Sequence, residues 1–176
     1  MTNVYVRMFK PNSVSDGFPG HYDLKVEGTW TFRNHSFTDP VFSYRLDGTL
    51  DVFDGSQSDT VYGINKGSSY ANCAQYYHRY TVDDQLIGIV LWNLELYVAS
   101  TEGEGSFIKC RLNDNCPFRT YDIHYYNCFA AVSVWLEAMR ITDLRTFYDT
   151  THETAMAACK PAVLEPNRPA SWIRIY

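Results

Sequence analysis

The sequence predicts an α+β fold in which an antiparallel sheet, formed mainly by the first half of the chain, packs against helices from the second half. Short runs that alternate between apolar and polar residues follow one another up to residue 53, as strands with one buried face do. Two later runs are apolar over helical lengths. With 176 residues, of which 45% are hydrophobic, the chain has the size of one domain, and we predict a single domain over residues 1–176.

The first two strands are predicted at residues 4–9 and 21–26, and a loop rich in Pro, Gly and Ser separates them. Within the second strand the alternation places His21, Asp23 and Lys25 on one face of the sheet. The opposite face then carries the apolar side chains of this strand, Tyr22, Leu24 and Val26.

A hairpin is predicted where the turn at Glu27-Gly28 joins residues 21–26 to a second alternating run, residues 29–37. Because facing residues of a hairpin lie within side-chain reach of each other, this arrangement would bring His35 close to His21.

A second hairpin and a helix follow. Residues 41–46 and 49–53 alternate on either side of an Asp-Gly turn, and residues 54–69 are predicted to be a polar loop. The apolar run from Leu86 has helical length, with Thr81 as its N-cap and a Gly-Glu-rich stretch at 102–105 as its end. This run has almost no polar face, so we expect the helix to be largely buried.

Cys128 opens the most informative segment, after an approach over residues 106–126 that is predicted to be irregular. Asn127 is a good N-cap, and the residues at helical spacing are Cys128, Val132, Trp135 and Met139. A thiol in the first turn of a helix faces the positive end of the helix dipole, which lowers the thiol pKa and favours the nucleophilic thiolate. The N–H groups of that turn can also stabilise an oxyanion. A further helix at 143–159 and a strand at 172–176 are predicted to close the chain.

A catalytic thiol needs a base and a third group that orients the base. The predicted hairpin makes His21 the candidate base and His35 the candidate orienting group. The alternatives are His124 as the base, and Asp23 or Asp39 as the orienting group.

These residues and their order resemble the permuted NlpC-like hydrolases of the papain-like superfamily, which include lecithin:retinol acyltransferase-like enzymes. The matching motifs are Gly20-His21-Tyr22, Asn34-His35 and Tyr126-Asn127-Cys128, which follow one another in this order. The resemblance implies a papain-like fold in permuted order. It also implies that Cys128 is the nucleophile, His21 the general base and then acid, and His35 the orienting residue, with no cofactor.

The resemblance further implies a cysteine hydrolase that cleaves amide bonds through a thioester, with peptides of bacterial peptidoglycan as the substrate. A lipid-ester hydrolase or acyltransferase and a non-catalytic binding module on the same scaffold are the alternatives. Residues 129–131 read Phe-Ala-Ala and not the Glu-His-Phe common in the acyltransferase branch, which argues against lipid chemistry. A small chain of this kind would suit an exported antibacterial effector, or toxin, that an immunity protein neutralises in its producer.

Charge and composition disfavour other classes of function. The formal net charge is −5, so nucleic acids and anionic membrane surfaces are unfavourable partners. The first ten residues read as a strand and not as a signal peptide, so we expect synthesis in the cytoplasm, followed by export through a dedicated secretion system to the periplasm or a target cell. We expect no membrane-spanning segment. The cysteines lack zinc spacing, so no metal is predicted, although Cys110 and Cys116 could pair in an oxidising compartment.

Overall fold

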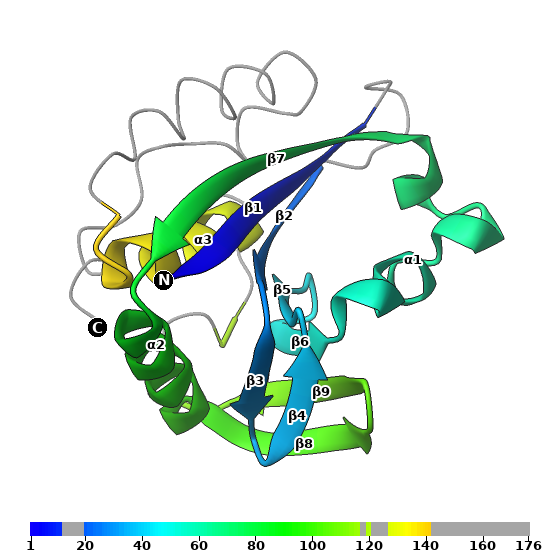
Figure 1. The fold of residues 1–176 in the computed structure, drawn as a ribbon. Coiled ribbons are helices and arrows are strands. Elements are labelled where there is room, and N and C mark those ends of the chain that lie inside the picture. The colour runs from blue at the N-terminus through cyan, green and yellow to red at the C-terminus, as the bar shows by residue number, and fades with distance from the viewer. Residues whose placement is uncertain (12–19, 117–118, 121–126, 142–176) are drawn as a thin grey trace.

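The computed structural model describes residues 1–11, 20–116, 119–120 and 127–141, which form an α+β fold (Figure 1). The strands are β1 (Thr2–Pro11), β2 (His21–Val26), β3 (Thr29–Phe32), β4 (His35–Thr38), β5 (Val41–Tyr44), β6 (Thr49–Phe53), β7 (Cys73–Val82), β8 (Val98–Glu104) and β9 (Phe107–Leu112). The α-helices are α1 (Ser58–Val61), α2 (Asp84–Leu96) and α3 (Cys128–Ala138). Short 3-10 helices are η2 (Gly55–Gln57), η3 (Ile64–Lys66) and η4 (Ser69–Asn72).

Within the described residues, one large sheet has the strand order β7-β1-β2-β5-β6-β9-β8, and β3 and β4 form a separate pair. Neighbouring strands of the large sheet run antiparallel. The β1–β2 register pairs Arg7 with Asp23 and Phe9 with His21. Paired residues of a ladder point to the same face, so these four side chains share one side of the sheet.

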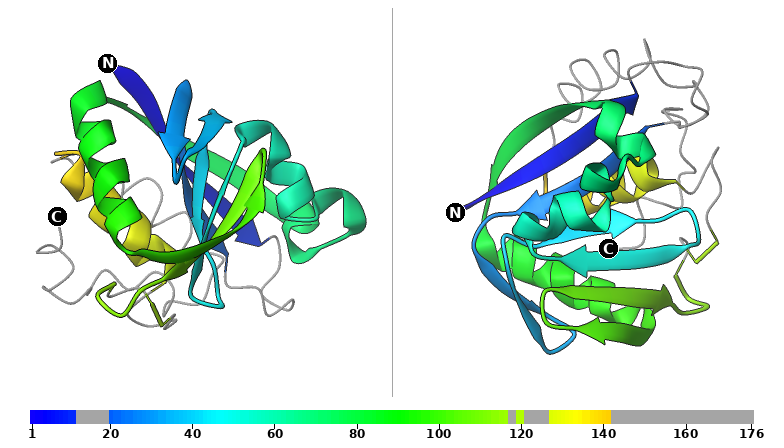
Figure 2. Two further views of the ribbon diagram at one scale, coloured as in Figure 1. Left: turned by 90° about the horizontal axis from the view of Figure 1, so that it is seen from below. Right: turned by 90° about the vertical axis from the view of Figure 1, so that its right-hand side faces the viewer.

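The two faces of β2 are covered by different parts of the chain. α2 and α3 lie next to each other on one side of the strands, whereas the short helices between β6 and β7 lie on the other (Figure 2). The ring of Phe129 on α3 packs edge-on against Tyr22, with 5.0 Å between ring centroids. On the opposite face, a smaller apolar cluster consists of Phe9, Val41, Phe53 and Tyr62.

Several elements predicted from the sequence are confirmed. Strands are present at 4–9, 21–26 and 49–53, and the 41–46 strand ends slightly early, at Tyr44. The predicted two faces of β2 are also confirmed, because Tyr22, Leu24 and Val26 all lie in the main core beside α3. The predicted elements at 143–159 and 172–176 lie outside the described residues.

The predicted hairpin over residues 21–37 is wrong. β2 pairs with β1 and β5, whereas β3 pairs with β4. The two residues that join β3 to β4, Arg33 and Asn34, have φ values of 51° and 63°, as the centre of a tight two-residue hairpin requires. The alternation over residues 29–37 therefore belongs to a hairpin of its own, which closes on itself before the chain returns to the sheet at β5.

The helix α2 differs from its prediction at both ends and on one face. Its N-cap is Asp83, whose side chain accepts a 2.8 Å hydrogen bond from the Gln85 backbone N–H. Only one face is buried, formed by Ile87, Val90, Leu91 and Leu94. The side chains of Ile89, Trp92 and Leu96 are more than half exposed. The helix thus packs on α3 and β3 along one stripe and presents apolar side chains to solvent on the other.

Two predicted irregular regions contain regular structure. The helix ends at Leu96, and β8 and β9 form an antiparallel hairpin through residues 98–112. The predicted loop at 54–69 contains α1 and several 3-10 turns. The strand β7, which pairs with β1 along ten residues, was also missing from the prediction.

Candidate active site

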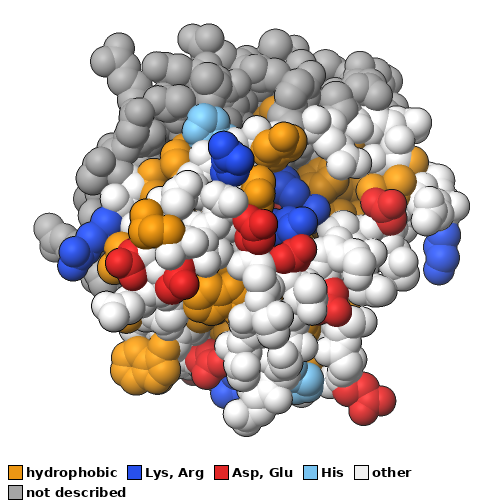
Figure 3. Space-filling view, viewed as in Figure 1, with side chains coloured by type: hydrophobic (Ala, Val, Ile, Leu, Met, Phe, Trp, Pro, Cys, Tyr) orange, Lys and Arg blue, Asp and Glu red, His pale blue; other side chains and the backbone are white. Residues whose placement is uncertain are grey.

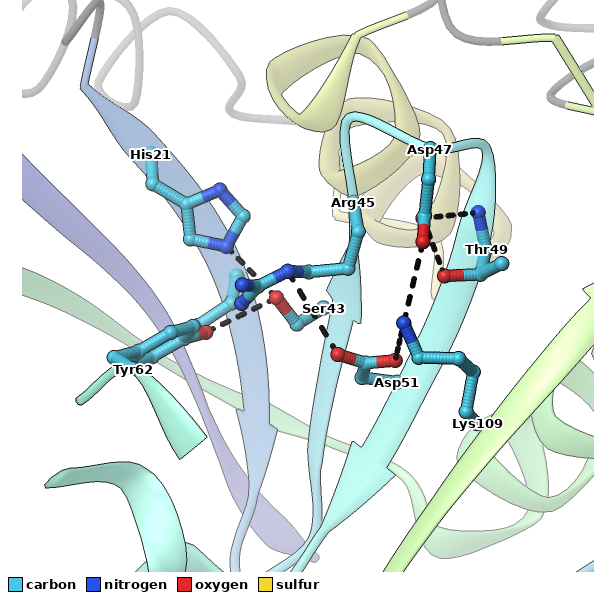
Figure 4. A network of polar contacts seen from close by, with 9 residues as sticks. His21, Ser43, Arg45, Asp47, Thr49, Asp51, Tyr62 and Lys109 are labelled. Atoms are coloured by element: carbon cyan, nitrogen blue, oxygen red, sulfur yellow. Dashed lines mark hydrogen bonds and ion pairs between the residues drawn. The ribbon is translucent and has the colours of Figure 1, made fainter. Parts of the chain in front are cut away.

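The imidazole of His21 is buried at the start of β2. Gly20 precedes it with a φ of 91°, a left-handed conformation that favours glycine. The His21 residue is only 5% exposed, and its Nε2 lies 2.8 Å from the Ser43 hydroxyl on the neighbouring strand β5. The rings of Tyr62 and Tyr70 pack edge-on against it, with centroids 5.5 and 5.8 Å away. Figure 4 shows the ring directed at the Ser43 hydroxyl, which the Tyr62 hydroxyl also approaches.

Burial holds His21 in its neutral form. The loss of water around the ring lowers the pKa of His21 from 6.5 to about 3. The negative charge of Asp23 opposes this change, whereas the positive charges of Arg45 and Arg7 add to it. At neutral pH the ring therefore carries one proton and can act as a hydrogen-bond donor at one nitrogen and a base at the other.

A buried ion pair lies beside the histidine. The carboxylate of Asp23, which is fully buried, accepts two hydrogen bonds of 2.7 Å from the Arg7 guanidinium. The Tyr62 hydroxyl donates a third, at 2.5 Å, and the same oxygen lies 3.0 Å from Ser43 Oγ. Burial alone lowers the pKa of Arg7, but Asp23 outweighs it, with help from Tyr62, and the pKa lies above its usual value.

A second group of charges borders the ring of Tyr62. The Arg45 guanidinium lies 5.2 Å from the Tyr62 ring centroid, and its Nε is 3.7 Å from Asp51. Lys109 lies 3.8 Å from Asp51 and 3.2 Å from Asp47. Burial raises the pKa of Asp51, although the two basic side chains oppose the change. Figure 4 shows two polar groups side by side, one that joins His21, Ser43 and Tyr62 and one that runs from Arg45 through Asp51 and Lys109 to Asp47.

Cys128 is the first residue of α3, as predicted. The side-chain oxygen of Asn127 accepts a 2.9 Å hydrogen bond from the Ala130 backbone N–H, which is the geometry of a helix N-cap. The next residue, Phe129, packs on Tyr22. This contact places the amino end of the helix near the start of β2, on the face that carries Tyr22 and not on the face of the His21 side chain.

Tyr70 is affected by both predicted reactive residues, through the charge of Cys128 and through the ring of His21. Burial raises the pKa of Tyr70, Arg45 opposes the change, and Cys128 adds to it. Burial, followed by the charges of Cys116 and Cys128, raises the pKa of Tyr44 on β5. The ring of Tyr70 in turn lies 5.8 Å from that of His21. Cys128 is only 2% exposed, so both predicted reactive groups are almost completely buried.

The reason for assigning His35 as the orienting group does not hold. His35 lies on β4, which does not pair with β2, and its Nδ1 is 2.7 Å from the backbone oxygen of Arg33. The side chain that hydrogen-bonds the His21 ring in the described structure is Ser43. Sequence reasoning missed Ser43, although its place in the alternating run of β5, on the polar side between apolar neighbours, was visible.

The other candidates have different positions. Asp23 lies on the same face as His21, but its carboxylate is bound by Arg7 and Tyr62. Asp39 accepts a 2.7 Å hydrogen bond from the backbone N–H of Gly28, so it serves the turn after β2. His124 lies outside the described residues.

A shallow pocket opens on the His21 side of the sheet. It has a volume of about 310 Å³, and its lining residues are Tyr5, Arg7, Lys25 and Tyr77. The register pairs Tyr5 with Lys25 and Arg7 with Tyr77, which places the lining on the same face as His21. In the space-filling view, basic and acidic side chains gather near the centre of the face beside hydrophobic ones (Figure 3).

The described residues also bear on metal binding, membrane insertion and disulfides. In that part of the chain no three His, Cys, Asp or Glu side chains come together as metal ligands. None of its helices is both long enough and apolar enough to cross a membrane. Cys110 and Cys116 are present as thiols and not as halves of a disulfide.

Comparisons of the chain with protein-family models, with curated proteins and with solved structures find no match. The resemblance to permuted NlpC-like hydrolases therefore stays a prediction from the motifs.

Proposed function

We propose that this chain is a cysteine hydrolase with a papain-like fold in permuted order. Cys128 would be the nucleophile and His21 the base, and Ser43 would take the orienting role first predicted for His35. The observation that carries the proposal is the hydrogen bond between His21 Nε2 and Ser43 Oγ. It occupies one ring nitrogen and leaves Nδ1 as the nitrogen that can serve the thiol at the start of α3.

The chemistry proposed for this site is acyl transfer through a thioester. The bare nitrogen of neutral His21 accepts the proton of the Cys128 thiol as sulfur attacks the carbonyl carbon, and a C–S bond forms. The imidazolium then gives that proton to the leaving amine as the C–N bond breaks. Water, deprotonated by the same nitrogen, attacks the thioester, releases the acid and restores the thiol.

The proposed substrate is a peptide of bacterial peptidoglycan, which rests on the resemblance. The pocket lined by Tyr5, Arg7, Lys25 and Tyr77 supports a substrate that has both carboxylates and an extended backbone. Aromatic rings offer contact area, and basic side chains attract carboxylates.

A second candidate, a non-catalytic binding module, is favoured by one observation. The residues Cys128 and His21 are 2% and 5% exposed, whereas a substrate carbonyl must reach the sulfur. The pocket would then be the functional site, and the buried polar groups would serve stability alone.

Product analysis decides between these functions. Wild-type protein, Cys128→Ala and Cys73→Ala are incubated separately with muropeptides and with phospholipid vesicles, and the products are identified by mass spectrometry. Cys73 is a matched control because its partly exposed thiol donates a 3.2 Å hydrogen bond to the Ser69 backbone oxygen and has no role in the proposed chemistry.

We expect muropeptide cleavage by the wild-type protein and by Cys73→Ala, and none by Cys128→Ala. Cleavage of the vesicle lipids alone would move the proposal to ester chemistry. An absence of product from both substrates, or equal product from all three proteins, would refute catalysis by Cys128 on them. His21→Gln is expected to lower kcat by about 100-fold or more, as loss of a general base does.

A further inference from the structure

A chain of four buried polar side chains ends at the His21 ring. It runs from Asp23 through Tyr62 and Ser43 to His21, with successive distances of 2.5, 3.0 and 2.8 Å. All four residues are at most 5% exposed. Water is thus largely excluded, and each proton in the chain must be shared among these groups.

Asp23 accepts hydrogen bonds at one end of the chain and donates none. Two hydrogen bonds from Arg7 hold this carboxylate as an ion pair, so it can only accept. Burial, followed by the charge of Asp23, raises the pKa of Tyr62 well above 10, and Tyr62 therefore keeps its hydroxyl proton. Tyr62 donates that single proton to the charged carboxylate of Asp23, in the shortest hydrogen bond of the chain.

The donor and acceptor in the other two hydrogen bonds, Tyr62–Ser43 and Ser43–His21, follow from this. The Tyr62 hydroxyl has donor geometry toward both Asp23 and Ser43, but it carries a single proton, which the shorter bond to the carboxylate takes. In the 3.0 Å contact with Ser43 the Tyr62 oxygen can therefore only accept. The Ser43 hydroxyl must therefore donate to Tyr62. Because Ser43 has one proton, its oxygen can only accept from the His21 ring, and the donor must be Nε2–H.

We infer that Asp23 and Tyr62 are positioning residues that fix the tautomer of His21, with the proton on Nε2 and the lone pair on Nδ1. Neither residue needs to touch the substrate. The catalytic meaning of this inference rests on the proposed function, because Nδ1 is the nitrogen that would accept the thiol proton. The tautomer itself is a property of the folded protein with or without catalysis.

The tautomer can be read directly by NMR. Uniformly ¹⁵N-labelled protein at pH 7 gives long-range ¹H–¹⁵N correlations for each imidazole, and the spectrum of His21→Gln identifies the His21 signals among the five histidines. We expect a protonated-type shift for Nε2 and an unprotonated-type shift for Nδ1. The opposite pattern, or a charged ring, in the wild-type protein would overturn the inference without any variant.

Tyr62→Phe tests the role of the chain. Removal of the phenolic oxygen leaves the Ser43 hydroxyl free to donate to His21 Nε2, so the Nδ1–H form should gain population by about fivefold or more, the ratio that one ordinary hydrogen bond sustains. Phe53→Leu is the matched control, because the Phe53 ring also packs on Tyr62, with centroids 5.8 Å apart, but has no polar atom that could join the chain. An unchanged tautomer ratio in folded Tyr62→Phe would refute the positioning role.

This test separates the inference from the proposed function. An Nε2–H tautomer in a protein that cleaves none of the substrates would sustain the hydrogen-bond chain and refute the hydrolase. If the protein does cleave muropeptides, Tyr62→Phe should lower kcat with little change in KM, because the substrate does not contact Tyr62.

Discussion

Replacement of His21 by glutamine is expected to remove a large part of the pH dependence of stability. The His21 pKa is about 3 in the folded protein, against 6.5 for an ordinary histidine. Between these values the unfolded chain binds a proton that the folded protein does not, so stability rises with pH. The contribution is fully present above pH 6.5 and is lost as the pH falls toward 3, by about 1.4 kcal/mol per pH unit.

Urea unfolding at pH 7.5, 6.5, 5.5 and 4.5 measures this term. Glutamine suits position 21 because its amide can still donate to the Ser43 hydroxyl. Carboxylates titrate in both proteins and cancel in the difference. From pH 7.5 to 4.5, the wild-type protein should lose about 2.7 kcal/mol more of its unfolding free energy than His21→Gln.

The control is a variant that is destabilised but keeps the histidine. Phe53→Leu removes a ring that packs on Tyr62, with centroids 5.8 Å apart, and should lower the unfolding free energy by about 1–3 kcal/mol at every pH. Its pH dependence should follow that of the wild-type protein. Parallel curves for the wild-type protein and His21→Gln would show that the folded protein does not keep this ring uncharged, and the proton count at Ser43 would lose its premise.

Three further predictions concern stability. Asn127→Ala should lower the unfolding free energy by about 1 kcal/mol through loss of the α3 cap, and an equal loss in Asn127→Asp, which keeps the acceptor, would contradict this in urea unfolding. Gly103→Ala should be clearly more destabilising than Gly105→Ala. Both have positive φ, worth roughly 1–2 kcal/mol, but only at Gly103 would the new methyl group lie 2.6 Å from a backbone oxygen of β9. Leu91→Ala should lower the unfolding free energy by about 2–5 kcal/mol and the thermal midpoint with it. Trp92→Ala, on the exposed face, should change the unfolding free energy by no more than about 0.5 kcal/mol. Similar losses in the two variants would contradict the one-sided burial of α2.

The elements that could be predicted from the sequence are those specified by neighbours in the chain. The alternation of β2 follows from the pleat of a strand, and the start of α3 follows from the capping side chain of Asn127. Cys128 could therefore be placed at a helix start, and His21 on the polar face of a strand, without knowledge of which strands pair.

Strand pairing could not be predicted in the same way. The run at 29–37 alternates equally well for a partner of β2 and for a self-contained hairpin, and the positive φ at Arg33 and Asn34, not the alternation, decides between them. β7 lacks a clear alternation because it is an edge strand with polar side chains on both faces, and its ten-residue pairing with β1 lies some 70 positions away in sequence. Ser43 is the partner of His21 because β2 pairs with β5. Since this pairing was not predicted, Ser43 could not be predicted either.

Because the hydrogen-bond partner of His21 is a serine, the buried Arg7–Asp23 ion pair nearby has a role. An amide or carboxylate oxygen beside a histidine can only accept, so it fixes the tautomer alone. A hydroxyl can donate or accept, so the protonation of His21 depends on what lies beyond Ser43. Buried charges are costly, and the Arg7–Asp23 pair adds little to stability that apolar residues could not supply. The Asp23 carboxylate lies two hydrogen bonds from Ser43. Because it can only accept, it sets the donor in each hydrogen bond up to the His21 ring.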